Sequence, residues 1–146
     1  MAYRPWLDEP DTESFTHAGL ECHILRQSKG GGHLCGYVEL PPDSKWNELN
    51  SIMRDSPADV HGGITFGPSA LTVDATRKYI GFDCAHLGDL APNYYDKHGE
   101  IYGQETYRDI NYVRKETMRL ADQVAKSRQP VTANQPSSED SGDGGE

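Results

Sequence analysis

Four stretches of the chain have the polar and apolar pattern of β-strands. Three of them are residues 20–27 (LECHILRQ), 33–40 (HLCGYVEL) and 78–85 (KYIGFDCA). Such patterns place successive side chains on opposite faces of a sheet. Three consecutive glycines separate the first two stretches, so we expect a β-hairpin there. The fourth predicted strand covers residues 59–66 (DVHGGITF), whose two glycines favour a bulge or a close backbone approach.

Two other stretches have helical periodicity. The clearer one covers residues 105–127, where Thr106 and Asp109 resemble a capping box. Ser44 is expected to cap a shorter helix over residues 45–55. Strands that precede a late helix, without β-α-β alternation, predict an α+β fold. We therefore expect an antiparallel sheet of four to five strands, with the long C-terminal helix packed on one face. The apolar positions of that helix are Ile110, Val113, Leu120, Ala121 and Val124.

The two ends of the chain are predicted to lie outside the folded domain. Residues 1–16 are polar and interrupted by proline, which indicates a flexible N-terminal segment in which Trp6 is a candidate anchor. Residues 129–146 are rich in Pro, Ser, Gly and acids, which is typical of a disordered acidic tail. A single α+β domain over residues 17–128 remains. Within it we expect a polar connection at 67–77 and a long loop at 86–104, of a length that is often functional.

Composition narrows the classes of function. The net charge of −9 argues against general nucleic-acid binding, which needs a basic face. There is no apolar run near 18 residues, so we expect neither a membrane span nor a secretory signal. The three cysteines are odd in number and form no C-x-x-C pair, so we expect reduced core residues in a cytoplasmic protein.

Two histidines and two aspartates lie close to several glycines, and they are the candidates for chemistry. Asp83, His86 and Asp89 recur every three residues, so a helical turn would bring their side chains to one face. His61 lies in another predicted strand, which a sheet can place alongside. We therefore name these four residues as candidate catalytic residues. Glycine amides and a threonine hydroxyl supply the candidate ligand-binding residues, which are Gly62, Gly63, Thr65 and Gly88.

Three chemistries remain open for this cluster. Imidazole and carboxylate groups suit a zinc, manganese or iron ion, although the spacing selects no particular metal or cofactor. A carboxylate that orients a histidine suits acid–base catalysis. Glycine amides suit an anion held without turnover. A purely architectural role for the same residues also remains open. The tyrosines at 94, 95, 102, 107 and 112 either stack on an aromatic ligand or close a small core.

Three short motifs carry a family resemblance. They are CGYV at 35–38, VHGGITF at 60–66 and YIGFDCAHLGD at 79–89. In this order they resemble a family of small proteins from tailed phages and bacteria, marked by Gly-Tyr-Val, His-Gly-Gly-x-Thr-(Tyr/Phe) and Gly-Phe-Asp-x-x-His-x-Gly-Asp. The resemblance implies phage or bacterial origin and a cytoplasmic location, and it implies no particular activity. It supports grouping the candidate residues into one site.

These observations together predict a small cytoplasmic phage-type accessory protein. We expect it to bind a small polar or anionic ligand, with a nucleotide as one candidate, at the His/Asp/Gly site. One alternative is a hydrolase or transferase that uses the same cluster, with or without a metal. The other alternative is an interaction protein that binds a host factor. The sequence leaves the oligomeric state open.

Overall fold

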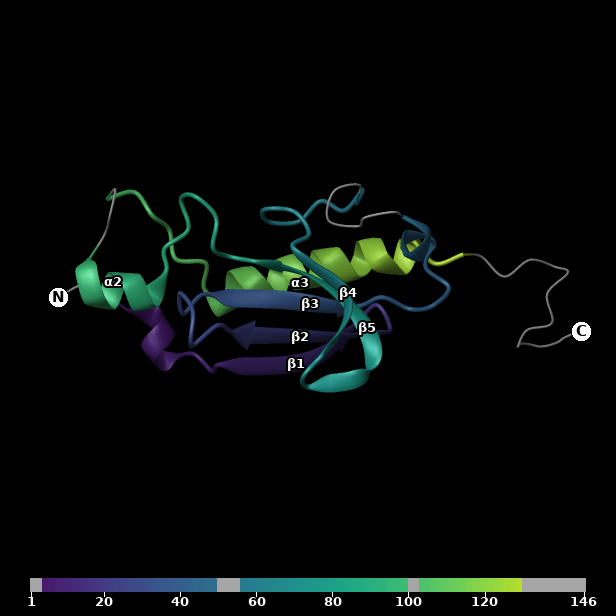
Figure 1. The fold of residues 1–146 in the computed structure, drawn as a ribbon, viewed down its shortest axis with the longest axis horizontal. Helices are drawn as coiled ribbons and strands as arrows, with labels where there is room; N and C mark the ends of the chain where they lie inside the picture. The colour runs from purple at the N-terminus through teal and green to yellow at the C-terminus, as the bar shows by residue number, and fades with distance from the viewer. Residues whose placement is uncertain (1–3, 50–55, 100–102, 130–146) are drawn as a thin grey trace, which may run out of the picture.

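A five-stranded antiparallel sheet is the centre of the structure. The computed structural model describes residues 4–49, 56–99 and 103–129. The strand order is β1-β2-β3-β5-β4, and all neighbours are antiparallel (Figure 1). The strands are β1 Thr12–His17, β2 Leu20–Arg26, β3 Leu34–Glu39, β4 Phe66–Leu71 and β5 Asp74–Asp83. The strands predicted over 20–27, 33–40 and 78–85 correspond to β2, β3 and the second half of β5.

Helix α3, Ile110–Lys126, packs on one face of this sheet, alongside β3 (Figure 1). All five of its predicted apolar positions are buried against β2 and β3, where they form the main core. Burying each of the four larger side chains, Ile110, Val113, Leu120 and Val124, contributes roughly 1.5–3 kcal/mol. The predicted α+β architecture is therefore confirmed. The three cysteines are also buried and free of disulfides.

The start of α3 differs from the prediction. The helix begins at Ile110 because Asp109 is its N-cap, with Oδ1 accepting a hydrogen bond from the Tyr112 N–H at 2.8 Å. Thr106 is not part of a capping box. Instead it forms an isolated parallel bridge with Asp89. An Asp at the N-cap position satisfies a helix donor directly, so the helix does not need to extend back to residue 105.

The N-terminal segment was predicted to be flexible, and the structure corrects this. Strand β1 pairs with β2 along its whole length and places Phe15 against the core. An edge strand buries only one face, so its sequence carries few apolar residues. The preceding 3₁₀ helix η1, Pro5–Asp8, holds Trp6, whose ring packs edge-on against Tyr95 and Tyr107. Trp6 thus anchors the segment, as expected, and two of the predicted stacking tyrosines belong to this packing.

The predicted strand at 59–66 is also wrong. Gly62 and Gly63 have φ values of +69° and +80°, and the Gly63 N–H donates to the Val60 carbonyl at 2.9 Å, so the chain turns here. The expected connection at 67–77 instead forms most of β4 and the start of β5. Strand β4 contains Pro68 and irregular pairing, which is typical of an edge strand and weakens its sequence pattern.

Two helical predictions need correction as well. The expected helix at 45–55 is a 3₁₀ helix, η2 Lys45–Glu48, with Ser44 as its cap, and residues 50–55 lie outside the described part of the chain. The long loop at 86–104 contains a short helix, α2 Pro92–His98, because Pro92 suits a first helical turn. The predicted acidic tail lies outside the described residues apart from Gln129. No helix among the described residues is long and apolar enough to cross a membrane.

Candidate functional site

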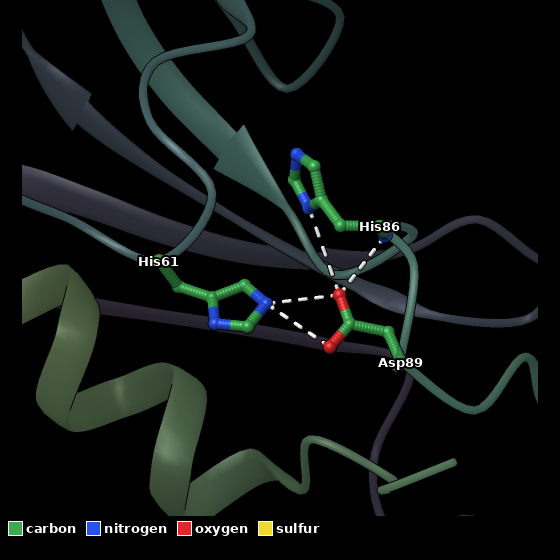
Figure 2. Close-up of side chains that lie close together, drawn as sticks. All are labelled: His61, His86 and Asp89. Carbon is green, nitrogen blue, oxygen red and sulfur yellow. Dashed lines mark hydrogen bonds and ion pairs between the residues drawn. The ribbon is translucent and has the colours of Figure 1, made fainter. Parts of the chain in front are cut away.

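Three of the candidate side chains meet at one carboxylate. His61 Nε2 lies 2.9 Å from Asp89 Oδ2 and 3.1 Å from Oδ1. His86 Nδ1 lies 3.6 Å from the same Oδ2. Figure 2 shows the His61 ring pointing at the Asp89 carboxylate from the side of α3, and the His86 ring beyond the end of β5, with Nδ1 facing the carboxylate and its other ring nitrogen turned away. One ligand atom from each residue falls within 4.8 Å of the others, which makes this group a candidate metal centre.

The chain after β5 folds so that His86 and Asp89 face each other. The Asp89 N–H donates to the His86 carbonyl at 2.9 Å, which closes a tight turn. The His86 N–H in return donates to Asp89 Oδ2 at 3.0 Å. Before this turn, the Ala85 N–H donates to Asp83 Oδ1 at 3.1 Å. Asp83, His86 and Asp89 are therefore brought together by a turn, as their three-residue spacing predicted.

Asp89 is a buried, charged acceptor. Its side chain is only 2% exposed, and Arg108 Nε donates to Oδ1 at 2.9 Å. Burial by itself would raise the pKa of this carboxyl. The hydrogen bonds from His61, Arg108 and the His86 backbone outweigh burial, so the pKa of Asp89 is lowered from its ordinary value. Asp89 thus carries a negative charge at neutral pH.

His61 is fixed at both ring nitrogens. Its Nε2 faces Asp89, and its Nδ1 lies 2.9 Å from the Tyr112 hydroxyl. Its backbone N–H donates to Glu116 Oε1 at 2.9 Å, which ties the turn to α3. Burial, with Glu116 nearby, raises the pKa of Tyr112, so the hydroxyl keeps its proton. A hydroxyl both donates and accepts, so Tyr112 can pair with either neutral tautomer of His61.

His86 is the less constrained imidazole. Its side chain is 35% exposed, and its buried Nδ1 has no hydrogen-bond partner among the described residues. The ring lies directly against Gly62, where an added Cβ would stand 2.5 Å from both ring nitrogens. The positive φ of Gly62 and this close approach both require glycine. Gly62 is therefore what allows His86 to face His61.

The remaining predicted residues lie around this centre. Asp83 Oδ1 is 3.5 Å from His86 Nδ1, so Asp83 is adjacent to the three-residue group. Thr65 lines a separate cavity that it shares with Asp83. The Gly63 amide is used in the Val60 turn, so it does not face a ligand as predicted. Gly88 lies within the turn with φ +93°, and its carbonyl accepts from the Thr106 N–H at 2.8 Å.

Sequence reasoning missed the partners that α3 and the segment before it supply. Arg108 binds Asp89, Tyr112 contacts His61, and Glu116 accepts from the His61 backbone. These three residues recur every four positions, which would have indicated a common helix face. His33 was also missed, although it lies close enough to Asp83 and Asp89 to sense their charge. Burial is the main cause that lowers the pKa of His33.

Comparison with known proteins assigns neither a family nor a function to this chain. No family model, curated protein or solved structure matches the chain. The resemblance to a family of small phage and bacterial proteins therefore stays a prediction from the three motifs.

Proposed function

We propose that this chain is a small cytoplasmic protein that binds a divalent metal ion at His61, His86 and Asp89, and through that ion a small polar or anionic ligand. One observation carries the proposal: the facing nitrogens lie 2.9 and 3.6 Å from one carboxylate oxygen. Ligand atoms 2.0–2.2 Å from a shared zinc or magnesium ion are about 3.0 to 3.4 Å apart. The two separations bracket that range, so a small movement would admit an ion.

Local charge favours a cation over an anion at this position. Asp83 and Asp89 bring two carboxylates, and Arg108 neutralises only one of them. With neutral imidazoles the group carries about one net negative charge, which repels an anion and attracts a divalent ion. The anionic ligand expected from the sequence is therefore proposed to bind through the ion, whose added charge reverses the sign of the site.

The surroundings of His61 support metal binding further. To bind an ion at Nε2, His61 must carry its proton on Nδ1, where the Tyr112 oxygen is placed to accept it at 2.9 Å. A metal-binding histidine commonly donates its second ring N–H to such a partner. Asp89 is likewise held by Arg108 at the oxygen that is farther from His86. Both groups are thus oriented before an ion arrives.

A hydrolase or transferase is the second candidate, and the incomplete ligand set favours it. Three protein ligands are typical of catalytic zinc sites, which leave a position for water, whereas structural sites use four. An ion held there would supply a water of lowered pKa. Asp83, whose Oδ1 is 3.5 Å from His86 Nδ1, would be the proton acceptor in such a reaction.

Metal titration tests the proposal. Protein freed of metal with EDTA is titrated with Mn²⁺, Zn²⁺ and Mg²⁺ by calorimetry, and with Co²⁺ by visible absorption. We expect one ion per chain, and loss of binding in His86→Ala and Asp89→Asn. His17→Ala is the matched control, because His17 also pairs with a carboxylate, Asp122, at 2.9 Å but outside the site. No stoichiometric ion, or equal loss in the control, would contradict the proposal.

Turnover is tested on the same metal-loaded protein with p-nitrophenyl phosphate and bis(p-nitrophenyl) phosphate. Hydrolysis that disappears in His86→Ala but persists in His17→Ala supports the hydrolase. Stoichiometric metal without hydrolysis of either ester limits the function to ligand binding.

A further inference from the structure

The cavity that Thr65 and Asp83 share opens on the face of the sheet opposite α3. It has a volume of about 250 Å³ and lies beside β3, β5 and the start of β4. Side chains alternate along β3, so Leu34 and Val38 join the core under α3, while Cys35 and Tyr37 belong to a separate cluster on the other face. The cavity therefore lies mainly on the face opposite α3, and Phe82 is the lining residue that belongs to the main core.

Aromatic rings form one wall of this cavity. Tyr37 and Phe66 pack edge to face, with their centroids 5.1 Å apart and an interplanar angle of 86°. Tyr37 is only 6% exposed, so its ring is fixed by its neighbours. Rigid aromatic surfaces of this kind suit a planar ring and tolerate several ring systems.

The polar side chains that line the cavity are Gln27, His33, Tyr37, Thr65 and Asp83, of which only the Asp83 carboxylate is purely an acceptor. Asp83 Oδ1 accepts from the Ala85 N–H, and Oδ2 takes part in no hydrogen bond with any described residue. The Thr65 hydroxyl likewise has no hydrogen-bond partner in the described part of the chain, although its backbone N–H is bound to the Gly81 carbonyl. His33 also lines the cavity, and its pKa is lowered, mainly by burial, so the imidazole is neutral near pH 7. A ligand that brings an N–H or O–H donor can therefore pair with the free oxygen of Asp83.

We infer that this cavity holds the planar, amine-bearing ring of a nucleoside or nucleotide, with Asp83 and Thr65 accepting from the ring and Tyr37 and Phe66 packing on it. The link to the first site is Asp83, which lines the cavity and also lies 3.5 Å from His86 Nδ1. A nucleotide whose base occupies the cavity would direct its phosphate toward the metal centre. The second half of this inference rests on the proposed function, and the first half does not.

Binding of nucleosides without phosphate isolates the cavity. Adenosine, guanosine, cytidine and uridine, their monophosphates, and inorganic phosphate are each titrated by calorimetry with and without Mn²⁺. We expect an amine-bearing nucleoside to bind without metal and more tightly than uridine. Its monophosphate should bind at least tenfold more tightly when Mn²⁺ is present, and inorganic phosphate should bind only with Mn²⁺.

Two variants test the assignment of the cavity. Thr65→Val keeps the branched shape but removes the hydroxyl, and Phe66→Ala removes part of the aromatic wall. Each should weaken nucleoside binding about tenfold, while Thr65→Val still binds Mn²⁺. Thr16→Val on the exposed side of β1 is the matched control. No nucleoside binding, or binding unchanged in both variants, overturns the inference. Nucleoside binding without Mn²⁺ binding would support the cavity and overturn the metal centre.

Discussion

Replacing Gly62 by alanine should separate the metal centre from the rest of the fold. The His86 ring occupies the space that a Cβ at this position would need, with both ring nitrogens 2.5 Å from it. The imidazole would have to rotate away from Asp89. Gly63→Ala is a closely matched control, because Gly63 has a similar φ of +80° but no atom within 4 Å of an added Cβ.

The expected losses of stability follow from the positive φ that the two glycines share and from the His86 contact that only Gly62 makes. A left-handed backbone costs an alanine about 1–2 kcal/mol, and both variants bear this cost. Overlap in a packed site adds about 1–3 kcal/mol, and only Gly62→Ala bears it. We therefore expect the free energy of unfolding to fall by about 1–2 kcal/mol in Gly63→Ala and by about 2–5 kcal/mol in Gly62→Ala. Displacing one of three ligands should weaken metal binding roughly 100-fold, since altering a supporting residue alone typically costs 10–100-fold.

Urea denaturation followed by circular dichroism measures the stability of both variants in EDTA. Mn²⁺ calorimetry then measures metal affinity at a temperature where both are folded. The contrast in affinity is the decisive result, because both variants share the backbone cost. Equal metal affinity in Gly62→Ala and Gly63→Ala would refute the argument that the glycine contact positions His86.

Four variants probe the site and the start of α3. Tyr112→Phe removes the partner of His61 Nδ1, and calorimetry should show Mn²⁺ affinity falling about 10- to 100-fold while the fold is kept. Because the pKa of Asp89 lies below the ordinary 3.8, its stabilisation is present above about pH 4 and lost as pH falls through the native pKa. In EDTA, the stability gap between the parent and Asp89→Asn should narrow as the pH falls below about 4; a gap that does not narrow there would contradict this. Asp109→Ala should lower stability by about 1 kcal/mol in urea denaturation, and Asp109→Asn should retain most of it.

The elements that bury a full apolar face were the ones the sequence predicted. Strands β2, β3 and the second half of β5 and helix α3 surround the main core, and their apolar spacing is correspondingly regular. The sequence pattern did not reveal the two edge strands, for two different reasons. Strand β1 has only Phe15 as a large apolar residue, and β4 includes Pro68. Edge strands need little burial and tolerate proline, so periodicity alone does not reveal them.

The site was predictable only where its residues are close along the chain. His86 and Asp89 share one turn, so their spacing indicated the contact. For Gly62 the sequence indicated only a bulge or a close backbone approach. It did not indicate that the His86 ring packs against this glycine. Tyr112 on α3 and Arg108 in the segment just before it reach the site because α3 docks against the sheet, and this placement depends on tertiary packing. A four-residue spacing indicates a shared face only within a helix, and it does not show what that face contacts.

The bridge between Asp89 and Thr106 has a consequence for how this protein can diversify. The Leu90 N–H donates to the Thr106 carbonyl, and the Thr106 N–H donates to the Gly88 carbonyl, both at 2.8 Å. Both ends of the intervening segment are thus fixed beside the metal-binding carboxylate. Because the entropy of closing a loop grows slowly with its length, insertions or exchanges within that segment should leave Asp89 in place. Changes between Leu90 and Thr106 could therefore alter which ligand binds next to the site while the position of Asp89 is kept.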